Sequence, residues 1–305
     1  MLAREEKDKG DIMSISEPTL QNWAKAPNCE KAKHTHEMIR KLIGNYQFDG
    51  KTIDTFLQGS YRNSTNITKD SDVDIVAYND GSFFSNKESM GKDFLEVHNR
   101  EFSNATYGFD RYKNELYDVL CKELGSDNVK YGEKCIKIKG NTSRLNSDVI
   151  PCVQYRYYTD KNDFEKYHSG IGLKTKNSEI IANFPKQHIE NTEEKNKNTN
   201  GYFKSAVRVF KNIRNYLGEN DIIDADTIPS YYLECLLWNV NTVFFSANSW
   251  CERILQILHA LVYLLKNDEA ENRVVQANNI YKLFHTKFWN LKEAKIFVDK
   301  TVKAI

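Results

Sequence analysis

The stretch Gln58–Tyr78, QGSYRNSTNITKDSDVDIVAY, decides the fold of this chain. Its final part, from Val73 to Ala77, has the β-branched composition of a short strand and ends before the turn signal NDG. Asp72 and Asp74 are two residues apart, so on a strand their carboxylates point to the same face, with Cα atoms about 6.6 Å apart. The apolar residues between and after them point to the opposite face. The pattern predicts a strand that is buried on one face and lined with carboxylates on the other.

A third acidic residue has a similar setting. Asp148 lies in LNSDVIPCV, and Pro151 indicates an edge strand or the end of a strand. If this strand lies beside the first, Asp72, Asp74 and Asp148 converge, and each pair at about 5 Å repels by roughly 3 kcal/mol at an effective dielectric near 20. Oxygen ligands suit Mg²⁺ or Mn²⁺ as the counter-charge, and two such ions about 4 Å apart can activate a hydroxyl and stabilise a leaving pyrophosphate. The alternatives are a solvated strand face for the first two residues and a turn residue for Asp148.

A small-residue pair precedes the acidic strand. Gly59 and Ser60 follow the predicted strand Thr52–Leu57, and eleven residues separate Ser60 from Asp72. Small residues at a strand–turn–helix junction allow backbone N–H groups to approach a phosphate closely. A Gly-Ser pair alone carries no information, but at this distance from an Asp-x-Asp strand it indicates a phosphate-handling site.

Composition excludes several classes of protein. The 305 residues are 40% hydrophobic and carry 43 basic and 42 acidic residues, a balance that disfavours binding to duplex nucleic acid. Mean hydropathy is −0.64, and the longest nearly apolar run, Ile254–Leu265, is too short for a membrane span. No secretory signal is visible at the N-terminus, so we expect a cytoplasmic protein without a membrane partner. The six cysteines form no CxxC pair and the seven histidines show no metal spacing, which predicts reduced thiols and no zinc site.

The periodicity predicts an α+β chain with a helical C-terminal part. We expect residues 1–15 to be a flexible N-terminus, 16–200 a catalytic lobe and 201–305 a helical lobe, with a solvated loop at 190–200. Helices are expected over Ser16–Tyr46 (interrupted near Pro27), Ala105–Leu124, Tyr202–Leu217, Ser230–Val240, Ser249–Lys266 and Leu291–Ile305. Further strands are expected over Asn128–Tyr131, Cys135–Lys139 and Leu145–Val153.

The order of these motifs resembles the DNA polymerase β-type nucleotidyltransferases, whose pattern is hG[GS], nine to thirteen residues, then Dh[DE]h. The wording GSYRNSTNI…SDVDIV and the later DVIPCVQYR are similar to the cyclic GMP–AMP synthase/DncV-like nucleotidyltransferases (CD-NTases) of bacterial anti-phage systems. SAVRVFKNIRNYL followed by IPSYYLE resembles the helical lobe of that family. The resemblance implies a mixed sheet with flanking helices, a C-terminal helical lobe, and an active site in the cleft between them.

The resemblance also implies roles for single residues. Gly59 and Ser60 would bind donor phosphates, Asp72 and Asp74 both metal ions, and Asp148 the catalytic ion, while helping to activate the attacking hydroxyl. In the helical lobe, Lys211 and Ser230 would contact the triphosphate and Tyr231 would stack on a base. The remaining alternatives are Lys204 as the phosphate lysine, Lys211 as a solvated cation, Ser230 as a helix N-cap, and Tyr231 as a core residue.

The function that follows from the resemblance is a metal-dependent enzyme that condenses NTPs, ATP among them, into a cyclic di- or trinucleotide second messenger for antiviral defence. Two Mg²⁺ or Mn²⁺ ions would be its cofactors. A separate effector would sense the product without stable binding, activation by duplex DNA is not expected, and the chain would be a monomer. The competing hypotheses are a linear nucleotidyltransferase acting on an RNA, small-molecule or protein hydroxyl, and a nucleotide-binding pseudoenzyme. The bases, the linkage, the ring size and the activating signal stay open.

Overall fold

The computed structural model describes residues 14–68, 72–266, 269–285 and 289–305. The chain divides into two compact units. One, the sheet unit, is Pro27–Glu190; the other, the helical unit, contains the described residues up to Ala26 together with Asn191–Ile305. This division differs from the expected boundaries at 16 and 200, because the first helix packs into the core of the helical unit.

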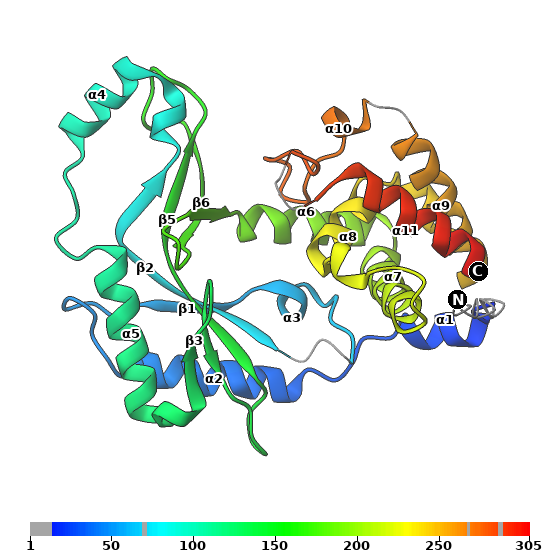
Figure 1. The fold of residues 1–305 in the computed structure, drawn as a ribbon, viewed down its shortest axis with the longest axis horizontal. Coiled ribbons are helices and arrows are strands. Elements are labelled where there is room, and N and C mark those ends of the chain that lie inside the picture. Colours follow the sequence, from blue (N-terminus) through cyan, green and yellow to red (C-terminus); the bar gives the residue numbers. More distant parts are fainter. Residues whose placement is uncertain (1–13, 69–71, 267–268, 286–288) are drawn as a thin grey trace, which may run out of the picture. The chain divides into compact units, whose positions relative to one another are not determined.

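A seven-stranded mixed sheet forms the centre of the sheet unit (Figure 1). Its strands are β1 (Asp54–Leu57), β2 (Val73–Ser85), β3 (Val129–Tyr131), β4 (Ile136–Ile138), β5 (Ser147–Tyr158), β6 (Tyr167–Lys174) and β7 (Ile180–Asn183). The order is β1-β2-β5-β4-β3, and β6 joins the second half of β5 to β7. Strands β2 and β5 run parallel, whereas all the other pairs are antiparallel. The mixed sheet with flanking helices confirms the expected architecture.

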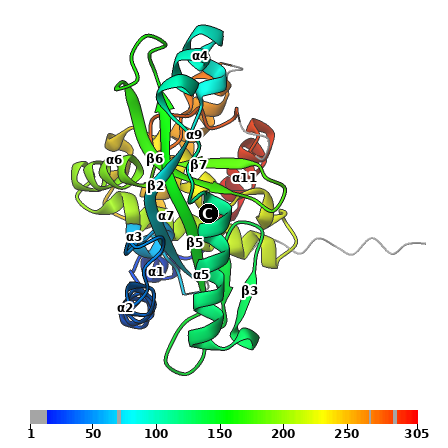
Figure 2. The same ribbon diagram turned by 90° about the vertical axis from the view of Figure 1, so that its left-hand side faces the viewer.

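One face of the sheet is covered by α2 (Glu30–Gly44) and α5 (Phe109–Leu124), and α5 lies against β3 and β5 (Figure 2). Val73, Ile75 and Ala77 of β2 are fully buried in this core, as their alternation predicts. The opposite face of β2 is more apolar than expected, because Val76 is also fully buried, in a second cluster with residues of β5 and β6. The carboxylate-lined face is therefore confined to the start of the strand.

The remaining helices of the sheet unit are short. They are α3 (Gly59–Asn63), α4 (Lys92–Glu101) and the 3₁₀ turns η1 (Lys87–Met90) and η2 (Ser126–Asn128). Helix α4 and strands β6 and β7 were not expected from the sequence, and β2 continues eight residues beyond its predicted end at Ala77. A bulge between Asn79 and Phe83 accommodates the turn-like NDG sequence inside this long strand.

The predicted loop at 190–200 is wrong, because α6 (Pro185–Asn198) covers most of it. Thr192 and Thr199 are buried, and the Lys195 ammonium donates to the carbonyl oxygen of Trp238 at 2.6 Å. Burial lowers the pKa of Lys195 to about 8. The polar composition of this segment therefore hides a helix that packs through hydroxyls and one lysine rather than through an apolar stripe.

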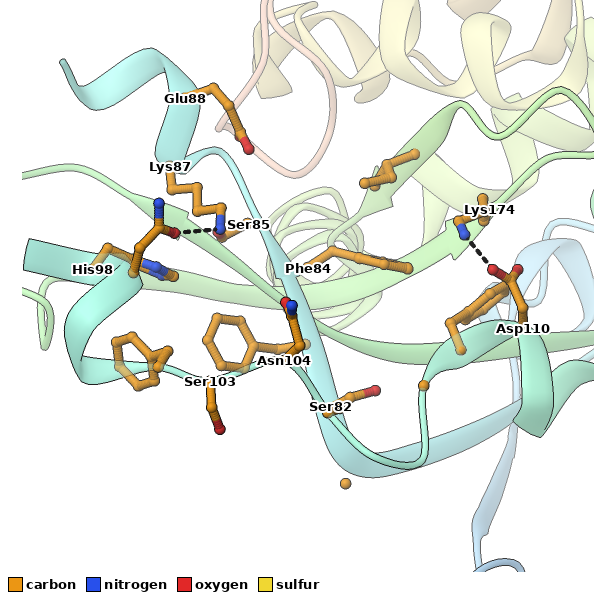
Figure 3. Close-up of a pocket in the computed structure, with 18 residues that line it drawn as sticks. Ser82, Phe84, Ser85, Lys87, Glu88, His98, Ser103, Asn104, Asp110 and Lys174 are labelled. Atoms are coloured by element: carbon orange, nitrogen blue, oxygen red, sulfur yellow. Dashed lines mark hydrogen bonds and ion pairs between the residues drawn. The ribbon is translucent and has the colours of Figure 1, made fainter. Parts of the chain in front are cut away.

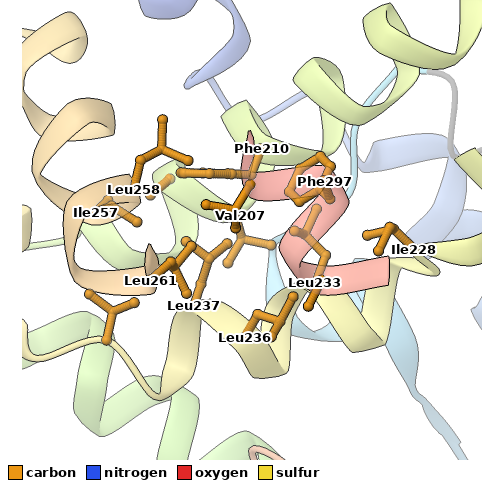
Figure 4. Packing of buried hydrophobic residues seen from close by; sticks show 14 of the residues in the cluster. Val207, Phe210, Ile228, Leu233, Leu236, Leu237, Ile257, Leu258, Leu261 and Phe297 are labelled. Atoms are coloured by element: carbon orange, nitrogen blue, oxygen red, sulfur yellow. The ribbon is translucent and has the colours of Figure 1, made fainter. Parts of the chain in front are cut away.

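The helical unit is built around α7, whose side chains are buried on almost every side. Its helices are α1 (Glu17–Trp23), α7 (Tyr202–Glu219), α8 (Ser230–Trp238), α9 (Trp250–Leu265), α10 (Ala270–Arg273) and α11 (Leu291–Ala304), with 3₁₀ turns η3 (Ala225–Thr227) and η4 (Thr242–Phe245). Figure 4 shows Val207 and Phe210 of α7 packed among Leu233 of α8, Leu261 of α9 and Phe297 of α11. The predicted helices of this region are confirmed, with ends that differ by one or two residues.

Hydrogen bonds fasten the N-terminal segment to the helical unit. The Arg208 guanidinium donates to the carbonyl oxygen of Ala24 from Nε at 2.9 Å and from Nη2 at 2.6 Å. Ile15 is buried and its N–H donates to Ala304. Of the expected flexible segment 1–15, residues 1–13 lie outside the described residues, and the expectation is wrong for Ile15. No helix of the described part of the chain is long and apolar enough to cross a membrane.

The Glu17 carboxylate accepts the backbone N–H groups of Trp250 and Cys251, at 2.9 and 2.7 Å, where α9 begins. Desolvation raises the pKa of Glu17, but these two donors outweigh it and hold the pKa at about 2, below the ordinary 4.5. Because the pKa is lower in the folded chain, this stabilisation is complete above pH 4.5 and is lost as the pH falls toward 2.

We expect Glu17→Gln to lower the free energy of unfolding at pH 7 by about 1 kcal/mol, the size of a carboxylate–helix N-terminus interaction. The difference between variant and wild type should shrink steadily from pH 4.5 to pH 2. Urea unfolding over this pH range measures it, with Glu194→Gln on the exposed face of α6 as the control. A constant difference at all pH values would contradict the capping role of Glu17.

Candidate functional site

The parallel pairing of β2 with β5 brings two of the predicted acidic residues together. Asp74 is the register partner of Asp148, so the two residues lie on adjacent strands, about 4.8 Å apart, with side chains on the same face. Both are half-buried, whereas their neighbours Val73, Ile75 and Val149 are fully buried on the other face. The prediction that the strand of Asp148 lies beside the strand of Asp74 is confirmed.

Asp72 has a different position. It precedes the first residue of β2 and is exposed. Among the described residues, no group of three or more His, Cys, Asp and Glu side chains is gathered closely enough to hold a metal ion. Bare carboxylates repel one another, so the approach of a third one depends on a cation between them. The convergence of all three carboxylates therefore stays a prediction.

The Gly-Ser turn packs directly against Asp74. Gly59 has a φ of +68°, in the left-handed region that favours glycine, and a Cβ at this position would lie 2.2 Å from Oδ2 of Asp74. The backbone N–H of Gln58 donates to the carbonyl oxygen of Asp74 at 3.0 Å. Ser60 follows in the first turn of α3. The structure thus brings Gly59, Ser60 and Asp74 together, and only glycine fits at position 59.

Strand β4 adds two residues that the sequence analysis left out of the site. Lys137 is the register partner of Asp148, and Cys135, two residues earlier on the same face, lies near the Asp148 carboxylate. Burial, together with the carboxylates of Asp148 and Asp74, raises the pKa of Cys135 to about 12, so the thiol stays protonated. The sequence indicates this only through the alternation Cys-x-Lys on a short strand, which places the two side chains on one face. Reading cysteines for disulfides or zinc does not reveal such a role.

The helical unit holds the other predicted site residues. Lys211 is 1% exposed, so the alternative of a solvated cation is wrong. Lys204 is also buried, and its ammonium lies 2.6 Å from Oε1 of Glu193. Ser230 is the first residue of α8 rather than its N-cap, which is Pro229. The N-cap alternative is therefore wrong as well.

Ser230 and Tyr231 lie in hydrogen-bonded surroundings. Ser230 Oγ accepts a hydrogen bond from Nη1 of Arg214 at 3.2 Å. The Tyr231 hydroxyl donates to Gln276 Oε1 and accepts from Asn278 Nδ2, both at 3.3 Å. Burial raises the pKa of Tyr231 well above its ordinary range. Tyr231 also packs against the hydrophobic core, so its role as a core residue is compatible with the structure.

Several cavities of the sheet unit lie along β2, and two of them are considered for the site. One of about 1000 Å³ borders the far end of the strand, with Phe84 and His98 among its lining residues and the Lys174–Asp110 ion pair at one edge (Figure 3). The other, of about 660 Å³, is lined by Tyr78, which is on the same strand face as Asp74, and by Gln187 of α6. Gln187 Oε1 itself is inaccessible to solvent and has no hydrogen-bond partner among the described residues. The smaller cavity is therefore on the face of β2 that carries Asp74.

Comparisons with known proteins agree with this geometry. Residues 190–305 match the model of the cGAS/DncV-like nucleotidyltransferase C-terminal helical domain. The cyclic nucleotide synthase CdnE01 of Staphylococcus haemolyticus is 34% identical over 295 residues, which are 94% of this chain and 97% of that protein. The cyclic UMP-AMP synthase of Rhodothermus marinus is 35% identical over 230 residues, 75% of this chain and 77% of that protein.

Solved structures give the same result. The Rhodothermus marinus CdnE c-UMP-AMP synthase with Apcpp and Upnpp superposes with a TM-score of 0.83 and 30% identity, covering 94% of this chain and 95% of that one. The sequence pattern, the mixed sheet and the helical C-terminal part therefore point to one family. The chain belongs to the cGAS/DncV-like nucleotidyltransferases, the CD-NTases, and is an enzyme of the nucleotidyltransferase class.

Proposed function

We propose that this chain condenses NTPs into a cyclic di- or trinucleotide and releases pyrophosphate. The observation that carries the proposal is the pairing of Asp74 with Asp148 beside the glycine turn at Gly59. Phosphoryl transfer needs charge stabilisation and positioning, and adjacent carboxylates beside a phosphate-sized turn supply the protein's part of both. The names of the relatives, which are cyclic nucleotide synthases, support the cyclic product.

The donor set fits a hard divalent cation. Asp74 and Asp148 offer only oxygen ligands on neighbouring strands, and Asp72 offers more from the residue before β2. We assign these three carboxylates to two Mg²⁺ or Mn²⁺ ions. When bound, the ions supply Lewis acidity toward the phosphates and the attacking hydroxyl.

The chain's own residues position the reactants. In our proposal, Asp148 accepts the proton of the attacking hydroxyl at a carboxylate oxygen, and the Gly59–Ser60 turn holds the donor phosphates close to Asp74. Lys211, Ser230 and Tyr231 serve the donor nucleotide, and Arg214 fixes Ser230 at the start of α8. We assign Lys211 as the phosphate lysine and keep Lys204, whose ammonium is paired with Glu193, as the alternative.

The cavity beside Tyr78 and Gln187 is our candidate for recognition of a base. It is a cavity on the face of β2 that carries Asp74. We place the cyclic product in antiviral signalling, where an effector senses it. This part of the proposal is supported by the resemblance to CD-NTases.

The function is tested by incubating the chain with the four NTPs and Mg²⁺ or Mn²⁺, followed by mass analysis of the products. We expect a cyclic di- or trinucleotide, two or three equivalents of pyrophosphate per ring, and no product in EDTA. Linear products alone would favour a linear nucleotidyltransferase, and binding without products would favour a pseudoenzyme. Full turnover in chelator would contradict the metal assignment.

The variant Asp72→Asn/Asp74→Asn separates chemistry from folding. It keeps the side-chain shape and removes two charges, so we expect unchanged or raised thermal stability without metal. Product formation should fall by at least about 10³-fold, the scale of a lost major electrostatic contribution. Differential scanning calorimetry and product analysis measure the two effects on one preparation. A folded variant that keeps its activity would show that these carboxylates are only a solvated strand end.

A further inference from the structure

Four charged residues form a straight row across the sheet. Lys130 of β3 is the register partner of Lys137 of β4, which is the partner of Asp148 of β5, which in turn is the partner of Asp74 of β2. Directly opposed residues project to the same face of a sheet, so all four side chains lie on the face opposite α2 and α5. Two cations therefore continue the line of the two carboxylates, at strand spacings of about 4.8 Å.

This arrangement of the two lysines does not favour folding. Like charges directly opposite each other on neighbouring strands destabilise a sheet. Both lysines are exposed, and neither forms an ion pair with any residue that the structure describes. The strands are anchored instead by Val129, Ile136 and Ile138, which are buried on the other face. The Lys130–Lys137 opposition therefore adds no stability, whereas Lys137 also faces Asp148, an opposite charge that favours the pairing of β4 with β5.

The turn beside Lys137 leaves room for its side chain. Gly132 and Cys135 form the turn that joins β3 to β4, and the N–H of Gly132 donates to the carbonyl oxygen of Cys135 at 2.8 Å. A Cβ on Gly132 would lie 3.3 Å from Cε of Lys137. The absence of a side chain at position 132 thus lets the Lys137 stem lie over the turn, on the same face as the Cys135 thiol that lies near Asp148.

The proposed reaction creates a need for such a pair of cations. Joining two NTPs places the hydroxyl of one, the acceptor, against the α-phosphate of the other, and the donor loses pyrophosphate. The acceptor keeps its own triphosphate, which leaves as pyrophosphate only when the ring closes. Two highly charged triphosphates are therefore present at once, and the residues proposed for the donor, Ser60, Lys211 and Ser230, account for one of them.

We infer that Lys130 and Lys137 form a polyphosphate subsite that holds the triphosphate of the acceptor nucleotide and of the linear intermediate. This inference rests on the proposed function. The row places the lysines beside Asp148, which is proposed to accept the proton of the acceptor hydroxyl. Ammonium–phosphate hydrogen bonds are charge-assisted and direct an anion without requiring one exact geometry. The subsite therefore discriminates by the number of phosphates and tolerates any base.

The test uses an acceptor that cannot act as a donor. A nucleoside triphosphate with a methylene group between its α- and β-phosphorus atoms keeps the charge but cannot release pyrophosphate. It is compared with the same nucleoside without phosphates, each combined with the NTP that the wild type joins to it. For Lys130→Gln/Lys137→Gln we expect the KM of the triphosphate acceptor to rise by about 10-fold, as for a lost charge-assisted bond. Because Lys137 also faces Asp148, kcat/KM for the unphosphorylated acceptor can fall too, but by a several-fold smaller factor than kcat/KM for the triphosphate acceptor.

A second readout does not depend on turnover. We expect calorimetric titration with inorganic tripolyphosphate to show weaker binding, or the loss of one binding event, in the double variant. The melting temperature should change little, because the loss of the like-charged Lys130–Lys137 pair and the loss of the opposite-charged Lys137–Asp148 pair act in opposite directions. Lys122→Gln is the matched control, since it removes an exposed lysine of α5, on the opposite face of the sheet, and should alter neither readout.

Three outcomes overturn the inference: an unchanged preference for the triphosphate acceptor, an equal loss with both acceptors, or unchanged tripolyphosphate binding. Failure of the proposed function looks different. In that case the wild type forms no linear or cyclic product with either acceptor, while the tripolyphosphate titration still decides whether the two lysines bind a polyphosphate.

Discussion

The parallel alignment of β2 with β5 is the constraint on which the rest of the site depends. It sets Asp74 opposite Asp148 on adjacent strands, with both side chains on one face of the sheet. The register is held from the other face, where Val73, Ile75 and Val149 are buried under α2 and α5. A slip of one residue would turn these side chains outward and the carboxylates into the core. Hydrophobic burial on one face therefore maintains the pairing of the two acidic residues on the other.

The neighbours of this pair follow from the same alignment. The Gly59 turn packs against Asp74. This close approach is possible because glycine has no Cβ, which would collide with a carboxylate oxygen of Asp74. Strand β4 presents a neutral thiol and a cation to Asp148. The helical unit is organised differently, around the central helix α7. Two of its buried charges have local partners: Lys204 pairs with Glu193, and Arg208 donates to the carbonyl oxygen of Ala24, which follows α1.

The sequence was sufficient to predict an element where functional residues and hydrophobic periodicity indicate the same structure. The alternation around Asp74, the glycine before it and the apolar stripes of α7 and α9 each have one local interpretation, and the structure confirms the corresponding strand and helices. It was insufficient where contacts between residues far apart in the sequence determine the local structure. Helix α6 lacks an apolar stripe and is held by Lys195, while Ile15 is ordered only by contact with the far end of the chain. The row from Lys130 to Asp74 joins four strands and becomes visible only when their register is known.

The central claim is that the pairing of Asp74 with Asp148 creates the metal and nucleotide site. Crystals grown with Mn²⁺ and a non-hydrolysable NTP test it directly, because manganese can be located by its anomalous scattering. The account predicts a peak within about 2.0–2.4 Å of carboxylate oxygens of both residues, with Asp72 drawn in to the same ion and the phosphates beside Gly59. A bound nucleotide with its manganese elsewhere, touching neither Asp74 nor Asp148, would contradict it.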